Sequence, residues 1–380
     1  MIGAPEYARR REALLSALDA DAWIAYGDDR QFAGADHVRY LTGLQPHFEG
    51  VIVVGGPGFV DILTGPETVG YAENSVGGID AILPIEEMAH PGLAYRSIAL
   101  ASGVERLAVR LRDARTVGLL GGDRMPAPLA AALLSRLPVV DAEDAAYRLR
   151  AIKTAEEQAL IDGAFAIAAE GMRAAAAALG PGATEAAVAA AAEARMREAG
   201  AEGFGIDAMV ASGATHSRTI LARSTAREVV RGDAVAVTLC PRFEGYHACL
   251  ARAFTVGPGP ELEDRLAAAR EAQRAALATL RAGKAGGDAV PACDAVLSAR
   301  VPEAEIRDVW VHSTGMVEFE PPVFTAGTDT VLRPGMAFNI DVPIFAAPWG
   351  GLRLEDGFSV TDHGIRPRLP DADTLVPVEV

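Results

Sequence analysis

The sequence predicts an α/β domain followed by an α+β domain. Its 380 residues are 50% hydrophobic and 23% charged, proportions that are typical of a folded globular chain. A chain of this length has room for two cores, since a domain usually takes ~150 residues. Before residue 150, short β-branched runs alternate with helical segments, and after it long helices come in pairs between strand-like pieces. Alternation predicts α/β packing, whereas paired helices with mostly antiparallel strands predict α+β packing.

Short aliphatic runs and helical spacing define the elements of the first domain, which we place at residues 1–150. Runs rich in Val, Ile and Leu predict buried strands at residues 21–26, 50–54 and 116–120. Apolar residues at helical spacing predict helices at residues 5–19 and 126–136.

A helix-capping pattern marks the start of the second domain, which we place at residues 151–380. Thr154 is followed three residues later by Glu157, just before a long apolar-periodic segment, and this spacing is typical of a capping box. Four helices are predicted from there on, at residues 154–179, 184–200, 261–282 and 287–299. The predicted strands lie at residues 204–212, 233–241, 245–256, 306–312, 336–343 and 352–360.

Charge and composition exclude several classes of partner. The 35 Lys and Arg against 51 Asp and Glu leave a formal charge of -16, which repels phosphate backbones and anionic lipid, so we expect neither nucleic acid nor membrane as a partner. No apolar run reaches the roughly 18 to 20 residues of a membrane span, and the N-terminus lacks the pattern of a secretory signal. The three cysteines are too scattered for a disulfide framework or a zinc finger. These features predict a cytoplasmic protein.

Polar residues interrupt several apolar strand segments, and their spacing places pairs of them on one face. Side chains two apart on a strand point the same way. Buried charged groups must be paired, metal-bound or neutralised, and their convergence is a common mark of catalysis. Each residue also has a structural alternative: a core histidine, a structural ion pair or a packed thiol. The pairs are Thr238 with Cys240, His247 with Cys249, Asn339 with Asp341, and Arg353 with Glu355, while His312 precedes Glu318 and Glu320.

The order of these segments resembles the creatinase, prolidase and aminopeptidase P family, which has the pita-bread fold. The resemblance implies a creatinase-type N-terminal α/β domain at residues 1–150 and an α+β pita-bread catalytic domain at residues 151–380. It extends over nearly the whole chain, and its motifs lie at Tyr40–Gly43, Leu149–Glu157, Ser212–Gly213, Gly232–Asp233, Gly245–Tyr246, Glu320–Pro322, Pro334–Met336 and Arg353–Asp356.

The family's metal positions are altered in this chain. The peptidases of the family hold two divalent metals with two Asp, one His and two Glu. A hydroxyl and a thiol cannot replace two bridging carboxylates for hard or borderline cations. The resemblance therefore implies that the dinuclear site is absent and that the chain uses no cofactor, as in the metal-less creatinase branch. The five positions fall at Thr238, Cys249, His312, Asp341 and Glu355.

The expected function is that of a metal-independent, creatinase-like hydrolase that cleaves a C–N bond in a small polar nitrogen compound. This reaction needs a proton donor for the leaving nitrogen and a base for water. We expect His312 to be the acid or base and Glu355 or Asp341 to be the carboxylate that orients it or activates water. A nucleophilic pair of Cys249 with His312 is a variant.

Substrate contacts are expected around these residues, and creatine itself is not the expected substrate. Creatinase carries a Glu where this chain has Ala251, and its catalytic His falls near Ile220, with His216 the closest histidine. The expected contacts are Arg353, His247, Thr238, His216, Glu320, His47 and Phe48.

Two alternatives stay open at this point. One zinc or manganese ion held by Cys249, His312, Asp341 and Glu355 would make the chain a mononuclear Xaa-Pro peptidase-like hydrolase. A non-catalytic binding protein that has kept the fold is the other, since fold does not fix function. The resemblance also implies a homodimer, in which residues 44–49 of one subunit reach the neighbour's active site.

Overall fold

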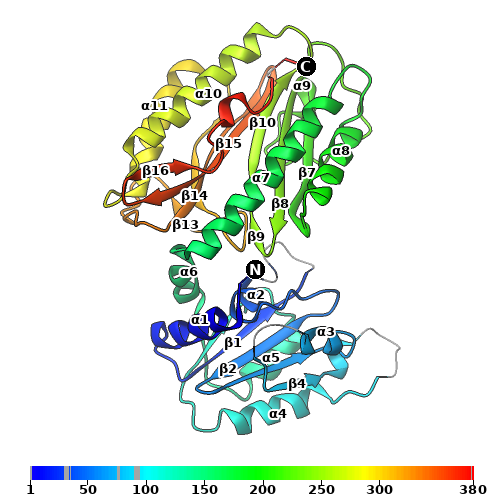
Figure 1. The fold of residues 1–380 in the computed structure, drawn as a ribbon, viewed down its shortest axis with the longest axis vertical. Coiled ribbons are helices and arrows are strands. Elements are labelled where there is room, and N and C mark those ends of the chain that lie inside the picture. Colours follow the sequence, from blue (N-terminus) through cyan, green and yellow to red (C-terminus); the bar gives the residue numbers. More distant parts are fainter. Residues whose placement is uncertain (1, 30–33, 35, 75–77, 90–94, 378) are drawn as a thin grey trace. The chain divides into compact units, whose positions relative to one another are not determined.

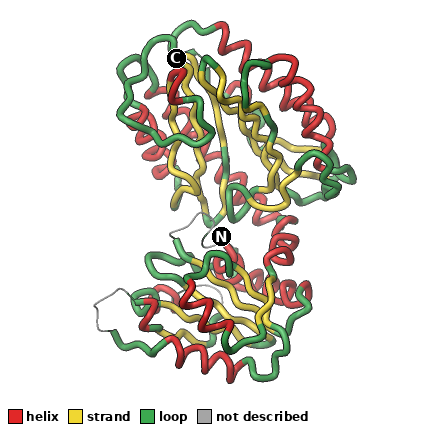
Figure 2. The backbone as a smooth tube through the Cα atoms, turned by 180° about the vertical axis from the view of Figure 1, so that it is seen from behind, coloured by secondary structure: helices red, strands yellow, loops and turns green. Residues whose placement is uncertain are grey.

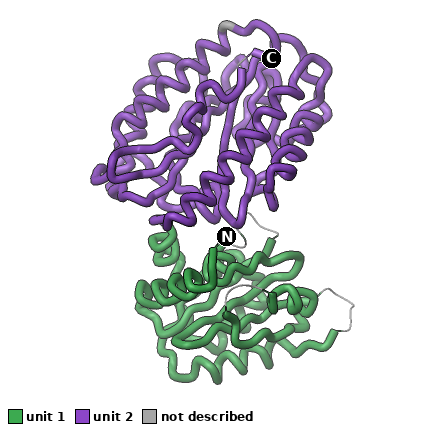
Figure 3. The backbone as a smooth tube through the Cα atoms, viewed as in Figure 1, with its two compact units in different colours: residues 1–150 green, residues 151–380 purple. Residues whose placement is uncertain are grey.

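A separate β-sheet organises each of two units of the chain, Met1–Arg150 and Ala151–Val380 (Figure 3). The computed structural model describes residues 2–29, 34, 36–74, 78–89, 95–377 and 379–380. The boundary at Arg150 comes just before the capping box of Thr154. There the Thr154 side chain accepts a hydrogen bond from the Glu157 backbone amide, and the Glu157 side chain accepts one from the Thr154 amide.

The first unit is built on a mixed sheet in the order β4-β3-β2-β1-β5-β6 (Figure 1). Strand β1 lies at its centre, antiparallel to β2 and parallel to β5, and all of its residues are buried. The strands are β1 (Ala22–Gly27), β2 (Val51–Gly56), β3 (Phe59–Thr64), β4 (Ala81–Pro84), β5 (Val117–Leu120) and β6 (Val139–Asp141). The helices are α1 (Ala4–Ala17), α2 (Asp36–Thr42), α3 (Val69–Glu73), α4 (Leu100–Arg110), α5 (Ala127–Leu134) and α6 (Glu143–Ala151), with a 3-10 turn at Glu86–Met88.

A buried group of charges joins α2 to α6 within this unit. Asp36 forms ion pairs with Arg150 and with Arg124, whose Nη1 lies 3.0 Å from Asp36 Oδ1, and none of these side chains is more than 9% exposed. Burial opposes ionisation of Asp36, but His37, Arg150 and Arg124 outweigh it and lower the pKa of its carboxyl. The charge of Asp36 is therefore retained and compensated inside the protein.

The second unit carries a long curved sheet in the order β13-β12-β14-β15-β10-β8-β7, with β11, β16 and β9 paired at its margins. The strands are β7 (Gly203–Ser212), β8 (Ala234–Phe243), β9 (Tyr246–His247), β10 (Leu250–Thr255), β11 (Ile306–Arg307), β12 (Trp310–Ser313), β13 (Glu320–Phe324), β14 (Ala337–Ala347), β15 (Gly350–Thr361) and β16 (Gly364–Pro367). The helices are α7 (Ala155–Ala178), α8 (Glu185–Glu198), α9 (Gly213–His216), α10 (Pro260–Thr279) and α11 (Ala289–Arg300), with 3-10 turns at Gly286–Asp288 and Ala372–Thr374.

Two pairs of helices cover this sheet (Figures 1 and 2). Helices α7 and α8 pack on β8 and β7, whereas α10 and α11 pack on β14, β15 and β12. Gly357 of β15 permits the close approach of α7, since a Cβ there would lie 2.1 Å from the ring of Phe165. Among the described residues, none of the helices combines the length and the apolar character that a bilayer span requires.

Alternation along most of β14 and β15 separates an apolar face from a polar one. Apolar side chains of the two strands join the cluster that α10 and α11 complete. The residues between them point to the opposite face of the sheet. On the apolar side are Phe338, Ile340, Val342, Leu352 and Leu354, and on the polar side are Asn339, Asp341, Arg353 and Glu355.

The structure differs from the predicted elements mainly where a strand is interrupted. The single strand predicted at residues 245–256 is divided into β9 and β10, and the break falls at Ala248 and Cys249. The Ala248 amide donates to the Pro241 carbonyl there, which bends the chain between the two strands. Several short elements, such as β3, β4, α2 and β16, were not predicted, because their runs are too short to show a period.

The buried charges of Asp36 should matter more to stability than charges on the surface. We expect Asp36→Asn to lower the free energy of unfolding by about 3–5 kcal/mol, because Arg150 and Arg124 would lose their buried partner. Glu170→Gln, which breaks exposed pairs with Arg173 and Arg195, should cost less than about 1 kcal/mol. Urea unfolding followed by circular dichroism measures both, and equal losses for the two variants would contradict the assignment.

Candidate active site

The polar face of the second sheet gathers the candidate residues from three neighbouring strands. In the register of the sheet, His312 of β12 lies opposite Asn339 of β14, and Asp341 of β14 lies opposite Glu355 of β15. Ala251 of β10 pairs with Glu355 from the other side. Antiparallel pairing thus brings residues far apart in the sequence into two neighbouring rows, His312 with Asn339 in one, and Asp341, Glu355 and Ala251 in the other.

Glu355 is the most heavily hydrogen-bonded carboxylate of this row. Its Oε1 accepts a hydrogen bond of 2.8 Å from Asn339 Nδ2 and lies 3.4 Å from His312 Nε2. Its Oε2 accepts a hydrogen bond of 3.0 Å from the Cys249 thiol. Burial opposes ionisation of this group, but the contact with His312, the nearby Arg353 charge and the hydrogen bond from Asn339 outweigh it and lower the pKa of Glu355 to about 2. Glu355 is therefore an anion at neutral pH.

His312 is fixed in position by its surroundings. Its ring stacks on Phe319, with the ring centroids 4.1 Å apart, and its Nδ1 lies 3.2 Å from the Ser313 carbonyl oxygen. This leaves Nε2 directed at Glu355. Burial favours the neutral imidazole, but the contact with Glu355 outweighs it and raises the pKa of His312.

Glu318 is a site residue that the sequence analysis noted after His312 but to which it gave no role. It lies in the turn between β12 and β13, is only 8% exposed, and approaches both Glu355 and the cysteines. Burial, followed by the negative charge of Glu355, raises its pKa to about 7. The available signal was an acid placed between the apolar residues Val317 and Phe319, directly after the strand of His312.

Two buried thiols complete this side of the cluster. Cys240 Sγ on β8 and Cys249 Sγ, in the break before β10, lie 3.0 Å apart. Burial raises the pKa of Cys240 to about 11, against the effect of its hydrogen bond with Cys249. The contact with Cys240, together with burial, raises the pKa of Cys249. A thiol that stays protonated is a poor nucleophile, so this geometry does not favour the Cys249–His312 nucleophilic pair.

Asp341 and Arg353 form a pair beside the cluster. Arg353 Nε lies 3.3 Å from Asp341 Oδ1, and the guanidinium is also 5.7 Å from the ring centroids of Trp310 and Phe345. Burial raises the pKa of Asp341 to about 8, although the Arg353 charge opposes the shift. Asp341 thus belongs to the same polar face but has a different partner from Glu355.

Three other predicted substrate contacts, Thr238, His247 and Glu320, each have different neighbours in the second unit. Thr238 is buried on β8 next to Cys240 in the alternation of the strand, and His247 lies close to Gly315, where its Nδ1 is 3.4 Å from the carbonyl oxygen. Glu320 instead accepts a hydrogen bond of 3.1 Å from Lys153 Nζ.

His216, His47 and Phe48 belong to other surroundings. His216 Nδ1 lies 2.8 Å from Glu185, in a network with Ser212 and Thr225. His47 is exposed in the first unit, where its Nδ1 lies 2.9 Å from Asp29, and Phe48 follows it with a positive φ of 68°. Within the second unit, His216 thus has Glu185 and not Glu355 as its partner.

The donor set of the cluster suits a divalent cation. His312, Glu318 and Glu355 each offer one ligand atom, and these atoms lie within 4.8 Å of one another. Imidazole nitrogen and carboxylate oxygen are both ligands of Zn²⁺, and catalytic zinc sites have three protein ligands. A cation would also offset the negative charge of Glu318 and Glu355, whose carboxylates are buried together. The residues present therefore fit a metal ion.

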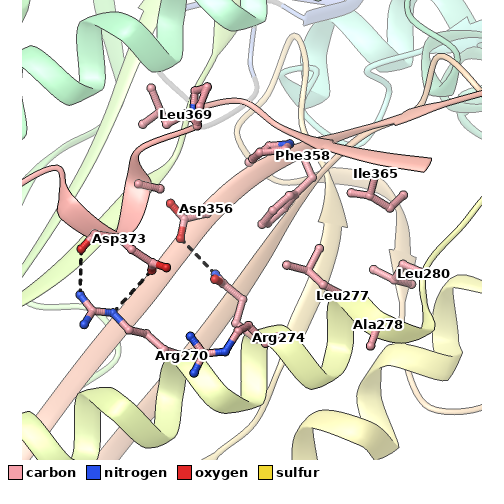
Figure 4. Close-up of a pocket in the computed structure, with 15 residues that line it drawn as sticks. Arg270, Arg274, Leu277, Ala278, Leu280, Asp356, Phe358, Ile365, Leu369 and Asp373 are labelled. Carbon is pink, nitrogen blue, oxygen red and sulfur yellow. Dashed lines mark hydrogen bonds and ion pairs between the residues drawn. The ribbon is translucent and has the colours of Figure 1, made fainter. Parts of the chain in front are cut away.

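A groove on the other side of the sheet is separate from this cluster (Figure 4). It has a volume of about 500 Å³ and lies between α10 and the strands β15 and β16. Asp356, which lines it, accepts hydrogen bonds from Gln273 and Arg252, and Arg270 pairs with Asp373. Because Asp356 follows Glu355 on one strand, the two side chains point to opposite faces.

Comparison with known proteins places these residues in a family context. The sequence profile of metallopeptidase family M24 matches residues 159–362. The chain is 29% identical over 242 residues to the uncharacterized peptidase YqhT of Bacillus subtilis, covering 62% of this chain and 67% of that protein. It is also 29% identical over 231 residues to the Xaa-Pro dipeptidase of Pyrococcus furiosus, covering 59% and 64%. The aligned regions thus span about two thirds of these relatives.

Solved structures of similar fold cover nearly the whole chain. The dipeptidase PepE from Mycobacterium ulcerans superposes with a TM-score of 0.78 at 26% identity, over 100% of this chain and 98% of that one. The X-Pro aminopeptidase from Thermotoga maritima superposes with a TM-score of 0.82 at 19% identity, over 98% of both chains. The predicted fold class, an α/β domain followed by a pita-bread α+β domain, is confirmed.

These comparisons confirm one functional prediction and correct another. The predicted reaction class, hydrolysis of a C–N bond, is confirmed by relatives that are named as peptidases and dipeptidases. The prediction that the protein uses no cofactor and works independently of metal is wrong, because the matching family is one of metallopeptidases. The physical reason is Glu318: it adds a carboxylate next to His312 and Glu355 in place of the missing Asp positions.

The burial of the thiols leads to a simple chemical prediction. Cys240, Cys249 and Cys293 are each at most 3% exposed, and burial contributes to a raised pKa in every case. We therefore expect none of them to react with a thiol reagent in the folded, metal-free protein and all of them to react after unfolding in denaturant. Titration with Ellman's reagent measures this. Rapid modification of Cys249 in the folded chain would show that the cluster is open to solvent and that its thiol is activated.

Proposed function

The chain belongs to metallopeptidase family M24, and we propose that it is a metal-dependent hydrolase that cleaves dipeptides of the Xaa-Pro type with a divalent ion held by His312, Glu318 and Glu355. The resemblance to the prolidase and aminopeptidase P group, stated from the sequence motifs, is confirmed. The substrate is proposed from the Xaa-Pro dipeptidase of Pyrococcus furiosus among the relatives.

One observation carries this proposal: three ligand atoms of the right chemistry lie within 4.8 Å of one another on the polar face of the sheet. All three side chains are buried, so water competes little with them for a cation. A bound ion supplies Lewis-acid chemistry, since it polarises the carbonyl group of the bond to be cleaved. This function corresponds to a mononuclear Xaa-Pro peptidase-like hydrolase, with Glu318 as a ligand where Asp341 was expected.

The chain's own residues hold these ligands in one orientation. Asn339 Nδ2 donates to Oε1 of Glu355, and the Cys249 thiol donates to Oε2, so both oxygens of the carboxylate are fixed. Stacking on Phe319 and the contact of Nδ1 with the Ser313 carbonyl fix the ring of His312. Outer partners of this kind set the tautomer and direction of a ligand.

Asp341 is the residue that we propose for proton transfer. It shares the polar face of β14 with Asn339 and stands opposite Glu355 in the register. Its pKa, raised to about 8 by burial, allows it to hold a proton at neutral pH and to give it to a leaving nitrogen. Arg353 lies beside it, with its Nε 3.3 Å from Asp341 Oδ1. Arg353, His247 and Thr238 remain the proposed substrate contacts.

Other expectations from the sequence stay predictions. A homodimer, a contribution of His47 and Phe48 to a neighbouring subunit's site, and a cytoplasmic location are among them. The same is true of His216 and Glu320 as substrate contacts, although each of them already has a partner in the structure, Glu185 and Lys153 respectively.

The proposed function predicts that peptidase activity requires a bound divalent ion and the side chains that hold it. Wild-type protein loaded with Zn²⁺ or Mn²⁺ should release free proline from a dipeptide such as Ala-Pro, and treatment with a chelator should abolish this release. We expect His312→Ala and Glu355→Gln to lose at least about 100-fold in kcat/KM, because loss of a ligand costs more than loss of its outer partner. Chromatography of the free amino acids, with metal analysis of the same samples, measures both quantities.

His363→Ala is the matched control, because this histidine is exposed in the turn between β15 and β16. It should keep the metal content and the activity of the wild type. Full hydrolysis by protein from which all metal has been removed would refute the proposal, as would wild-type activity in Glu355→Gln.

A further inference from the structure

The groove on the α10 side of the second sheet has no role in the hydrolytic proposal (Figure 4). Its volume of about 500 Å³ is that of a small-molecule site, since such sites span roughly 300–1,000 Å³. Helix α10, the hairpin of β15 and β16, and residues 369–373 after the hairpin form its walls. All of these segments belong to the second unit, so the groove is formed within one compact unit.

Apolar side chains line one end of the groove, and Figure 4 shows them away from Asp373, which lies at the other end. Two of them are only partly buried, although they pack against the apolar cluster of this unit. An apolar group that covers such a surface removes it from water, which is favourable. The two partly buried side chains are Leu277 and Ile365, and Leu280 and Phe358 lie beside them.

Two arginines of α10 give the other end of the groove donors that the protein does not use. Arg274 is exposed and has neither a hydrogen bond nor an ion pair among the described residues. Arg270, one turn earlier, donates one hydrogen bond of 3.3 Å from Nη2 to the Asp373 carbonyl. Its Nε lies 3.6 Å from Asp373 Oδ1, which is too long for a hydrogen bond. Because an arginine has five N–H donors, both guanidinium groups can still bind an anion.

The balance of charge in the groove favours an anion over a cation. Asp356 is already compensated, since its Oδ1 accepts a hydrogen bond of 2.6 Å from Arg252 Nη2. With that pair included, the groove has three cations and two anions, whereas the whole chain has a net charge of -16. The local excess of positive charge therefore attracts an anionic ligand. The five charged residues are Arg252, Arg270, Arg274, Asp356 and Asp373.

We propose that this groove is a second binding site, which takes a small monocarboxylate with an apolar body. The carboxylate pairs with the guanidinium groups of Arg274 and Arg270, an arrangement that suits the planar fork of arginine. The apolar body covers Leu277 and Ile365. None of these residues belongs to the proposed metal cluster, so the inference does not depend on the hydrolytic proposal.

The position of the groove separates its ligand from a peptide at the metal cluster. Asp356 lines the groove, whereas Glu355, the residue before it on β15, points to the opposite face of the sheet. Gln273 of α10 donates a hydrogen bond of 3.4 Å to the Ile340 carbonyl and so joins the groove wall to β14. The carboxylate and the peptide should therefore bind at the same time.

Fluorine NMR of 4-(4-fluorophenyl)butanoate tests this site with metal-free, full-length protein. The line width of the fluorine signal is recorded as protein is added. We expect saturable binding by the wild type. The alcohol 4-(4-fluorophenyl)butan-1-ol has the same apolar body without the charge, and it should bind roughly tenfold more weakly, because it cannot form charge-assisted hydrogen bonds with two arginines.

Two variants examine the two ends of the groove separately. Arg274→Gln should weaken binding of the carboxylate about tenfold and leave the alcohol unaffected, because only the charged contact is lost. Ala278→Trp should abolish binding of both, since Ala278 lines the groove and the larger side chain would fill it. The matched controls are Ala278→Ser and Arg281→Gln, which removes an exposed arginine outside the groove. Both controls should bind as the wild type does, and circular dichroism checks that each variant is folded.

His312→Ala distinguishes this site from the metal cluster, because it should lose hydrolysis of Ala-Pro but keep the affinity for the carboxylate. Absence of saturable binding to the wild type would overturn the proposal. So would equal affinity for the alcohol, unchanged binding in Arg274→Gln or Ala278→Trp, or loss of binding in His312→Ala. A wild type that binds the carboxylate but does not hydrolyse Ala-Pro would refute the hydrolytic proposal alone.

Discussion

Burial of the Glu355 carboxylate within β15 is the constraint on which the site depends. An isolated carboxylate in such surroundings costs several kcal/mol, so the protein must compensate it. Asn339, Cys249 and His312 do so from three different segments of the chain. Their contacts require the register of β12, β14 and β15, and the helices packed on the apolar face maintain that register. Fold and site are therefore coupled through one side chain.

The same constraint explains why a cation belongs in the cluster. Glu318 brings a second buried carboxylate close to Glu355, and burial with this neighbouring charge raises the pKa of Glu318 to about 7. A divalent ion would remove the repulsion and use both carboxylates as ligands. The metal-independent function was expected because carboxylates are missing at Thr238 and Cys249. That prediction left out the carboxylate that Glu318 adds.

The sequence predicted the features that depend on the local period of a strand. It did not predict the features that depend on contacts between segments far apart in the chain. The shared faces of Asn339 with Asp341 and of Arg353 with Glu355 follow from the two-residue period of a strand. The contacts between different segments do not follow from this period. Glu320 accepts a hydrogen bond from Lys153, which is 167 residues away, and Glu318 reaches the site from a turn that has no period. The break at Cys249, which directs its thiol at Glu355, likewise depends on a contact of Ala248 with Pro241.

The most direct test of the account is a crystal structure of zinc-loaded protein with data collected on both sides of the zinc absorption edge. The account predicts an anomalous difference peak at bonding distance, roughly 2.0–2.2 Å, from His312 Nε2 and from a carboxylate oxygen of both Glu318 and Glu355. A map without a peak between these three side chains, from crystals in which they keep their present hydrogen bonds, would contradict it.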